Sequence, residues 1–285
     1  MKYISLAIVI FILLFSIATS QATDLGNHNK QFTAPKDMIK SDWSNPEELE
    51  RTWNAALVRI PIENGKYQSF VMKDIAEQSD AEKRHPAIIY LHGCSGIWQG
   101  TYTRVNFFAQ SGYAVIAPVS FARAKYPQSC DIYQHKGGMY RHTLKMRQYD
   151  AAHAINNAKQ LPWVDPNNVF LIGLSQGGVT TATLSSKDPN TSVNARVIEG
   201  WTCHAGWSEY KGINAPKDEP VLSIVGAKDP WFQNDWTRGH CGRFMKNEFS
   251  ESVVFKKGYL STRHELLEDH DVQKIVLDFI NKHKH

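Results

Sequence analysis

The sequence has little of several features that mark specialised classes of protein. Its charge is nearly balanced, with 32 Lys and Arg against 28 Asp and Glu in 285 residues. The basic residues are scattered rather than clustered, which argues against nucleic-acid binding. Gly and Pro number only 18 and 12, which excludes a collagen-like chain. A hydrophobic fraction of 42% with so small a net charge excludes a disordered chain. A globular protein of one large α/β domain or two smaller domains remains.

Long apolar runs are also scarce, and the single one lies at the N-terminus. Lys2 precedes the apolar stretch 4–17, and Ser20-Gln21-Ala22 supplies the small residues that a signal peptidase requires. The stretch is about 14 residues long, short of the roughly 20 that span a bilayer as a helix. We interpret residues 1–22 as a signal peptide, with an uncleaved membrane anchor as the alternative. Residues 23–285 are then a single domain, exported to the periplasm or the medium, without stable membrane insertion.

Cysteine is rare but even in number. The four cysteines are Cys94, Cys130, Cys203 and Cys241. After export they would lie in an oxidising compartment, where disulfides persist. Three pairings are possible, and proximity in the chain favours Cys94–Cys130 and Cys203–Cys241. The pairs Cys203-His204 and His240-Cys241 allow a zinc site as the alternative, although adjacent ligands lack the spacing typical of structural zinc. We expect two disulfides and no metal.

Apolar runs of strand length alternate with segments of helical spacing over most of the chain. The expected strands cover residues 86–91, 113–118, 169–173, 196–200, 220–225 and 252–256. The expected helices cover residues 103–110, 143–160, 176–185, 234–247 and 265–282. Upstream, Asn45 and Pro46 predict a helix start, and a hairpin is expected around residues 63–66. The alternation predicts a mostly parallel, doubly wound α/β sheet with helices on both faces.

The segment Gly173-Leu174-Ser175-Gln176-Gly177 is the strongest local signal of chemistry. It follows an expected buried strand and precedes an expected helix, which is the context of a G-x-S-x-G nucleophile elbow. The turn is so sharp that side chains at the flanking positions would collide with neighbouring elements. We interpret Ser175 as a nucleophile. A glycine-rich turn with a bystander serine is the alternative.

A serine nucleophile needs a base and a carboxylate that orients the base. In this architecture the order along the chain is Ser, acid, His. Asp229 and His264 each follow an expected strand, so both would reach the edge of the sheet where ligand sites of α/β proteins form. Glu199, which ends an earlier strand, is the best alternative acid. We predict a triad of Ser175, Asp229 and His264.

An oxyanion hole needs a second backbone N–H from the loop after an early strand. The segment His92-Gly93-Cys94-Ser95-Gly96 follows the first strong parallel strand and contains two glycines. We expect the backbone N–H groups of Cys94 and Gln176 to form the hole, with His92 holding the loop by hydrogen bonds. Cys94 as a competing nucleophile is the alternative, although nothing in the sequence places a base beside it.

From about Pro86 to Phe279, the sequence resembles the α/β-hydrolase superfamily, and more closely its dienelactone hydrolase-like branch. The resemblance rests on Leu91-His92-Gly93-Cys94-Ser95-Gly96, Gly173-Leu174-Ser175-Gln176-Gly177-Gly178, Gly226-Ala227-Lys228-Asp229-Pro230 and His264, in the order of the family. It implies the α/β-hydrolase fold with Ser175, Asp229 and His264 as the triad. Dienelactone hydrolases proper carry cysteine where this chain has Ser175, so the serine favours a carboxylic ester.

The expected activity is hydrolysis of a small-molecule ester or lactone through an acyl-enzyme, without a cofactor. Four aromatic residues near the site loops are candidates for the substrate pocket: Trp98, Tyr102, Trp231 and Phe232. Arg104 and Arg123 are candidates to attract a substrate carboxylate or, alternatively, solvated surface residues. Alternative functions are a catalytically silent binding protein of this fold and a peptidase or thioesterase. Substrate identity and oligomeric state stay open.

Overall fold

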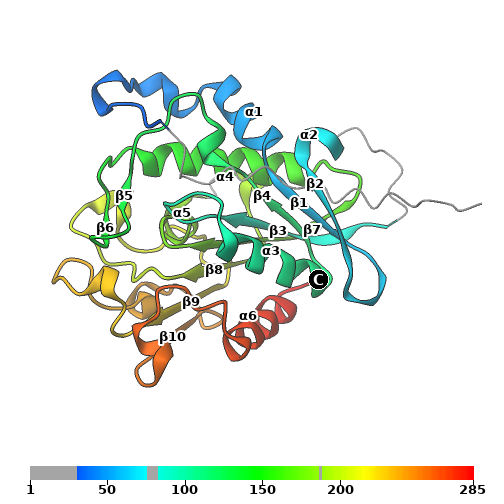
Figure 1. Ribbon diagram of the computed structural model, residues 1–285. Coiled ribbons are helices and arrows are strands. Elements are labelled where there is room, and N and C mark those ends of the chain that lie inside the picture. The colour runs from blue at the N-terminus through cyan, green and yellow to red at the C-terminus, as the bar shows by residue number, and fades with distance from the viewer. Residues whose placement is uncertain (1–30, 76–82, 186–187) are drawn as a thin grey trace, which may run out of the picture.

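The computed structural model describes residues 31–75, 83–185 and 188–285 (Figure 1). The predicted signal peptide, residues 1–22, lies outside the described residues. Within the described ranges, no helix has the length and apolar character that a membrane crossing requires.

A sheet of eight strands forms the centre of the protein (Figure 1). The strand order is β10-β9-β8-β7-β3-β4-β1-β2. In this order the strands are Glu251–Phe255, Val221–Gly226, Ala195–Glu199, Val164–Leu174, His85–Leu91, Ala114–Ala117, Leu57–Pro61 and Tyr67–Val71. The strands from β10 to β4 pair in parallel, and β1 is antiparallel to both β4 and β2. The predicted, mostly parallel sheet is therefore confirmed, and the predicted hairpin forms its antiparallel edge.

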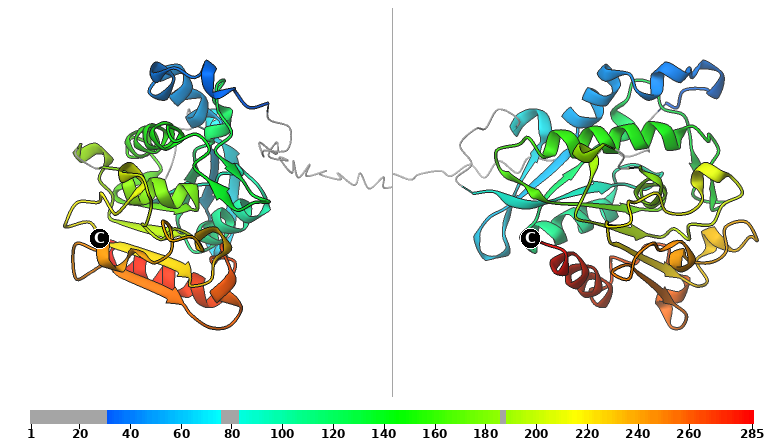
Figure 2. Two further views of the ribbon diagram at one scale, coloured as in Figure 1. Left: turned by 90° about the vertical axis from the view of Figure 1, so that its left-hand side faces the viewer. Right: turned by 180° about the vertical axis from the view of Figure 1, so that it is seen from behind.

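Helices cover both faces of this sheet because its strands present apolar side chains on both sides. The helices are α1 (Pro46–Asn54), α2 (Met72–Ile75), α3 (Gln99–Gln110), α4 (Thr143–Ala158), α5 (Gln176–Thr183) and α6 (His270–Lys282). In β3, Ile88 and Tyr90 pack in the cluster that contains α3 and α6, whereas Ala87 and Ile89 pack with α1, α2 and α4. Figure 2 shows the two layers on opposite sides of the sheet.

The predicted helix over residues 234–247 is wrong. The structure has turns there and one short 3-10 segment, Cys241–Phe244. Gly239 takes a φ of +139°, which no right-handed helix allows. Cys241 is also bound covalently to Cys203, so the segment is fixed by a bond that helical periodicity does not reveal.

The predicted helix over residues 265–282 begins later than expected, at His270. Asp269 is its N-cap and accepts hydrogen bonds from the backbone N–H groups of Asp271 and Val272. An aspartate in this position satisfies donors that would otherwise lack partners. Residues 265–269 are left as part of the loop after β10, which also carries His264.

The parallel strands end at one edge of the sheet, and the loops after them meet there. Cys94 follows β3, Ser175 follows β7, Asp229 follows β9 and His264 follows β10. Because parallel strands direct all their carboxyl ends to the same edge, residues far apart in the sequence converge at this place. This edge therefore holds the candidate site.

Candidate active site

Ser175 occupies a sharp turn between β7 and α5. Its backbone has a φ of +57° and a ψ of −115°, a strained conformation for a residue with a side chain. A Cβ on Gly173 would lie 2.3 Å from the carbonyl oxygen of Gly177, and a Cβ on Gly177 would lie 2.0 Å from that of Leu91. Only glycine fits at both positions, which gives the G-x-S-x-G pattern its physical reason.

Asp229 and His264 come together through the loops after β9 and β10. Nδ1 of His264 lies 2.7 Å from Oδ2 of Asp229, and the backbone N–H of Trp231 donates to Oδ1 at 3.0 Å. Since a carboxylate only accepts, Nδ1 carries the proton and Nε2 is the basic nitrogen. In the described part of the chain, Nε2 is buried and has no hydrogen-bond partner. Such a nitrogen is suited to take a proton from a substrate or a nucleophile.

His264 packs against the strand end that also anchors Ser175. The backbone N–H of Ser175 donates to the carbonyl oxygen of Glu199 at 2.8 Å. A Cβ on the next residue, Gly200, would lie 3.2 Å from Cε1 of His264. The indole of Trp231 stacks on the imidazole with ring centroids 5.2 Å apart, and Trp231 and Ser175 line the same pocket. The structure thus brings the predicted serine, acid and histidine to one place.

The loop after β3 passes directly beside Ser175. A Cβ on Gly93 would lie 3.7 Å from Cβ of Ser175. Cys94, Ser175 and Gln176 all line one pocket. The two residues whose N–H groups we predict to form an oxyanion hole therefore share a pocket with the candidate nucleophile.

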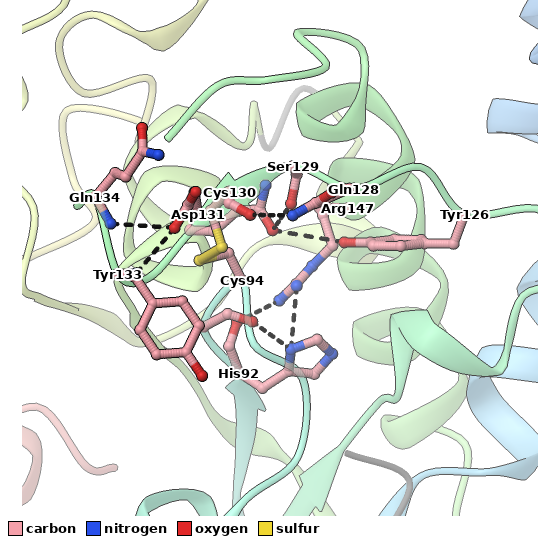
Figure 3. Close-up of a disulfide and its surroundings, with 12 residues drawn as sticks. His92, Cys94, Tyr126, Gln128, Ser129, Cys130, Asp131, Tyr133, Gln134 and Arg147 are labelled. Carbon is pink, nitrogen blue, oxygen red and sulfur yellow. Dashed lines mark hydrogen bonds between the residues drawn. A yellow bond between two sulfur atoms is a disulfide. The ribbon is translucent and has the colours of Figure 1, made fainter. Parts of the chain in front are cut away.

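His92 holds this loop in place, as predicted (Figure 3). The backbone N–H of Ser120 donates to Nε2 at 3.2 Å, so Nδ1 carries the proton and donates to the carbonyl oxygen of Gly93 at 2.7 Å. Burial, followed by the charge of Arg147, holds the pKa of His92 well below its usual value. Arg147 also donates to the carbonyl oxygen of His92 at 2.6 Å. The neutral imidazole of His92 thus connects the loop to Ser120, and its main-chain carbonyl connects the loop to Arg147.

A disulfide joins Cys94 to Cys130 (Figure 3). Cys130 begins a small hairpin of β5 (Cys130–Asp131) and β6 (Lys136–Gly137). Just before it, Oγ of Ser129 donates to Oε1 of Gln176 at 3.2 Å. These two links fasten the hairpin to both loops that carry the predicted oxyanion donors. Because Cys94 is in a disulfide, the alternative of a free cysteine nucleophile is wrong.

The second predicted disulfide, Cys203–Cys241, is also present. Both residues are fully buried. Since both sulfur atoms are bonded to each other, the alternative of a zinc site with His204 and His240 is wrong. No cluster of three or more metal-ligating side chains occurs among the residues that the structure describes.

Glu199, the alternative acid, fixes the loop around His264 instead of contacting its ring nitrogens. It forms a fully buried pair with Arg104, with 2.6 Å from Nη2 to Oε1 and 2.8 Å from Nε to Oε2. Oε1 also accepts from the backbone N–H groups of Leu266 and Leu267 at 2.7 and 2.8 Å. No local pattern in the sequence indicates this role, because the contact joins residues 67 positions apart.

The two candidate arginines do not reach the pocket. Arg104 is engaged by Glu199, and Arg123 forms a pair with Asp150 at 2.6 Å from Nη2 to Oδ1. Arg123 also donates to the carbonyl oxygen of Asp42 at 2.7 Å. Both guanidinium groups are completely buried, so the expectations of substrate capture and of a solvated surface are both wrong.

Glu265 places a titrating carboxyl directly after His264. Its Oε2 lies 3.4 Å from Nη1 of Arg104. Burial raises the pKa of Glu265 to about 7, against the opposing charge of Arg104. This group therefore changes charge near neutral pH, within the loop that carries the candidate base.

A pocket of about 700 Å³ has Ser175 in its wall. Of the four predicted pocket residues, Trp231 and Phe232 line it. Four aromatic residues that were not predicted line it as well: Trp201, Trp207, Trp236 and Tyr210. Trp98 and Tyr102 are not among its lining residues. The ring of Trp98 lies over Gly100, and Tyr102 packs against the core cluster of α3. The missed tryptophans lie on loops without a periodic pattern, so no local signal marks them.

Comparison with protein families supports this architecture. The model described as "Dienelactone hydrolase family" matches residues 73–256, which is more than half of the chain. The match contains Ser175 and Asp229 and ends before His264. Dipeptidyl-peptidase 5 from Porphyromonas gingivalis is 23% identical over 205 residues, a match that covers 70% of this chain and 26% of that protein. The chain thus spans about a quarter of the length of this curated relative.

Solved structures share the fold at low sequence identity. A protein from Klebsiella pneumoniae, named as a proposed dienelactone hydrolase, superposes with a TM-score of 0.53 and 17% identity, covering 80% of this chain and 100% of its own. Dipeptidyl peptidase 4 from Porphyromonas gingivalis gives 0.51 and 14%, covering 80% of this chain and 33% of its own. The match to the family model, the mostly parallel sheet and the sharp turn at Ser175 agree. The chain belongs to the dienelactone hydrolase family and has the α/β-hydrolase fold.

Proposed function

We propose that the protein is an exported serine hydrolase that cleaves carboxylic esters through an acyl-enzyme on Ser175. The observation that carries this proposal is the 2.7 Å pair of His264 and Asp229 beside a pocket that has Ser175 in its wall. A serine hydroxyl attacks a carbonyl only with a general base, and an imidazole oriented by a buried carboxylate is such a base.

In the proposed reaction, Oγ of Ser175 attacks the carbonyl carbon while Nε2 of His264 takes its proton. Asp229 stabilises the imidazolium that results. The backbone N–H groups of Cys94 and Gln176 meet the charge that develops on the carbonyl oxygen, and one such donor contributes about 3 kcal/mol. The imidazolium then protonates the leaving alcohol, and water, activated by the same histidine, releases the acid.

A peptidase is the second candidate because the matched relatives include dipeptidyl peptidases. A substrate that loses a dipeptide from its N-terminus brings a free ammonium group into the site, and a buried ammonium needs a carboxylate partner. Among the described residues that line the pocket, none is Asp or Glu. The charge of the pocket therefore favours an ester over an N-terminal dipeptide.

Export is proposed from the apolar leader and from the two disulfides, which persist in oxidising compartments. Cleavage after Ala22 would make Thr23 the first residue of the mature chain. N-terminal sequencing of protein recovered from the periplasm or medium of a bacterial host tests this. A full-length chain confined to the cytoplasm, with four free thiols, would contradict export.

The activity is tested with p-nitrophenyl acetate and the variant Ser175→Ala. We expect kcat/KM to fall by about 10³-fold or more, because the chemical step has lost its nucleophile. Ser111→Ala, at the exposed end of α3, is the matched control and should keep full activity. Mass spectrometry after labelling with a fluorophosphonate should locate the adduct on Ser175.

Three results would change the assignment. Undiminished hydrolysis by Ser175→Ala would remove this serine as nucleophile. Faster turnover of a dipeptidyl p-nitroanilide than of any ester would favour the peptidase. A wild-type protein that neither reacts with the probe nor hydrolyses esters would favour a catalytically silent binding protein.

A further inference from the structure

Aromatic rings dominate the wall of the pocket beside Ser175. Four of the eight tryptophans in the chain line it, together with one phenylalanine and one tyrosine: Trp201, Trp207, Trp231, Trp236, Phe232 and Tyr210. Trp236 is 73% exposed and Trp207 is 38% exposed. Leaving indole surface in water is unfavourable, and apolar surface gathered at one place marks a binding site. The proposed acyl transfer itself does not need these rings.

Contacts order two of these rings and the main chain that carries a third. Trp231 stacks on His264 with ring planes 26° apart. The guanidinium of Arg141 lies over Trp207, 5.0 Å from the ring centroid. The backbone N–H of Trp236 donates to the side chain of Asn234 at 3.0 Å. Flat walls that are already ordered favour a planar ligand, because the contact area is large and little side-chain freedom is lost on binding.

The charge of the wall selects among planar ligands. Within the described lining, Lys136 is the one Lys or Arg, and neither Asp nor Glu occurs. His135 adjoins Lys136 and contacts Trp231 with ring centroids 5.4 Å apart. Indole faces alone would attract cations, but a cation here would meet no carboxylate among the lining residues and would be repelled by Lys136. An anionic group is attracted instead.

We infer that the pocket binds the aromatic part of the ester, a planar ring system that carries an anionic group. A volume of about 700 Å³ lies in the range of small-molecule sites and accommodates two fused rings. The inference rests on the proposed function for the cleavage at Ser175. Recognition of the ligand depends on the residues of the pocket wall, so binding can be measured without turnover.

Calorimetric binding to the wild-type protein tests the inference with four ligands of similar size. They are 2-naphthoate, 2-naphthamide, trimethyl(2-naphthylmethyl)ammonium and decahydro-2-naphthoate. We expect 2-naphthoate to bind most tightly. The saturated acid should bind about fivefold more weakly because it lacks flat faces. The neutral amide should bind about threefold more weakly, and the cation should bind most weakly of the aromatic ligands.

Variants assign these preferences to residues. Trp236→Ala should remove most of the difference between 2-naphthoate and its saturated analogue. Lys136→Gln should remove the difference between 2-naphthoate and the amide. The control for Trp236→Ala is Tyr133→Ala. Tyr133 is 90% exposed, between β5 and β6, and lies outside the pocket lining. The control for Lys136→Gln is Lys217→Gln, at an exposed lysine that does not line the pocket. Both should bind all four ligands as the wild type does.

The outcomes separate the inference from the proposed function. Equal affinity for the aromatic and saturated acids, or tightest binding of the cation, would overturn the inference even if the protein hydrolyses esters. The expected order of affinities, abolished by Trp236→Ala and Lys136→Gln, would support it even if Ser175→Ala showed that another residue is the nucleophile.

Discussion

The two disulfides close loops of nearly equal length. Comparing the removal of each one therefore distinguishes a specific role of the loop after β3, which carries Cys94, from a general effect on stability. Cys94–Cys130 and Cys203–Cys241 have sequence separations of 36 and 38. In the chain-entropy model, a cross-link over such a loop destabilises the unfolded chain by about 4 kcal/mol. Replacing either pair by alanine should therefore lower the free energy of unfolding by nearly the same amount. Equilibrium urea unfolding of the two double variants measures this.

The same two variants should differ in catalysis. The first bond ends at Cys94, whose N–H is a proposed oxyanion donor, and complete loss of such a donor lowers kcat by about 10²- to 10³-fold. His92 would still bond Gly93 and Ser120, so we expect a partial loss, about tenfold in kcat. The bond Cys203–Cys241 braces the loops that carry pocket tryptophans. Its removal should raise KM and leave kcat within about twofold.

The assay is steady-state hydrolysis of p-nitrophenyl acetate at a temperature where circular dichroism shows both variants folded. Equal losses of kcat in the two variants would refute the assignment of a special role to Cys94. An unchanged kcat without the Cys94–Cys130 bond would show that His92 alone positions the loop. A loss of stability confined to one pair would contradict the argument from loop length.

Three further substitutions probe the loop that carries His264. Glu199→Gln should lower kcat about tenfold with KM unchanged, because the neutral amide binds the loop more weakly than the carboxylate. Steady-state kinetics measures this, and an unchanged kcat would show that Glu199 only stabilises the fold. Burial raises the pKa of Glu265 from 4.5 to about 7 in the folded chain. The folded chain therefore binds more protons between these values, and stability should fall by about 3 kcal/mol in all as pH rises from about 4 to 8 and then level off. Urea unfolding across this range should show the fall in the wild type and a smaller one in Glu265→Gln. Gly200→Ala places a Cβ 2.8 Å from the carbonyl oxygen of His264 and should lower kcat by about 10²-fold. Gly112→Ala, with a similar positive φ and open space around it, is its control, and equal activity of the two variants would contradict a steric cause.

The elements that the sequence predicts well are those whose causes are local. The apolar run of β7, the glycines that flank Ser175 and the helix that follows form one continuous signal. Asn45 caps α1 through the backbone N–H of Glu47, as its position before Pro46 predicts. The order of strands then places Asp229 and His264 at the same edge without any further information.

The elements that the sequence does not predict depend on contacts between distant residues. Glu199 binds the backbone of Leu266 and Leu267 across 67 and 68 positions, and nothing near Glu199 in the chain indicates this. The loop 234–247 has apolar residues at helical spacing, yet a glycine and a disulfide determine its path. The tryptophans of the pocket come from two loops, the one after β8 and the one after β9, and only the folded chain brings them to one wall.

Glu199 has a consequence for how the site moves. Its main-chain carbonyl binds the N–H of Ser175, and its carboxylate binds the N–H groups two and three residues after His264. Ser175 and the loop that carries His264 are therefore both anchored to the end of β8, so a displacement of that strand moves them together. Trp236 and Lys136 lie on other loops and do not share this anchor. Exchange of these outer loops should therefore redirect specificity without changing the chemistry, because the contacts that tie Ser175 and the loop of His264 to β8 are left in place.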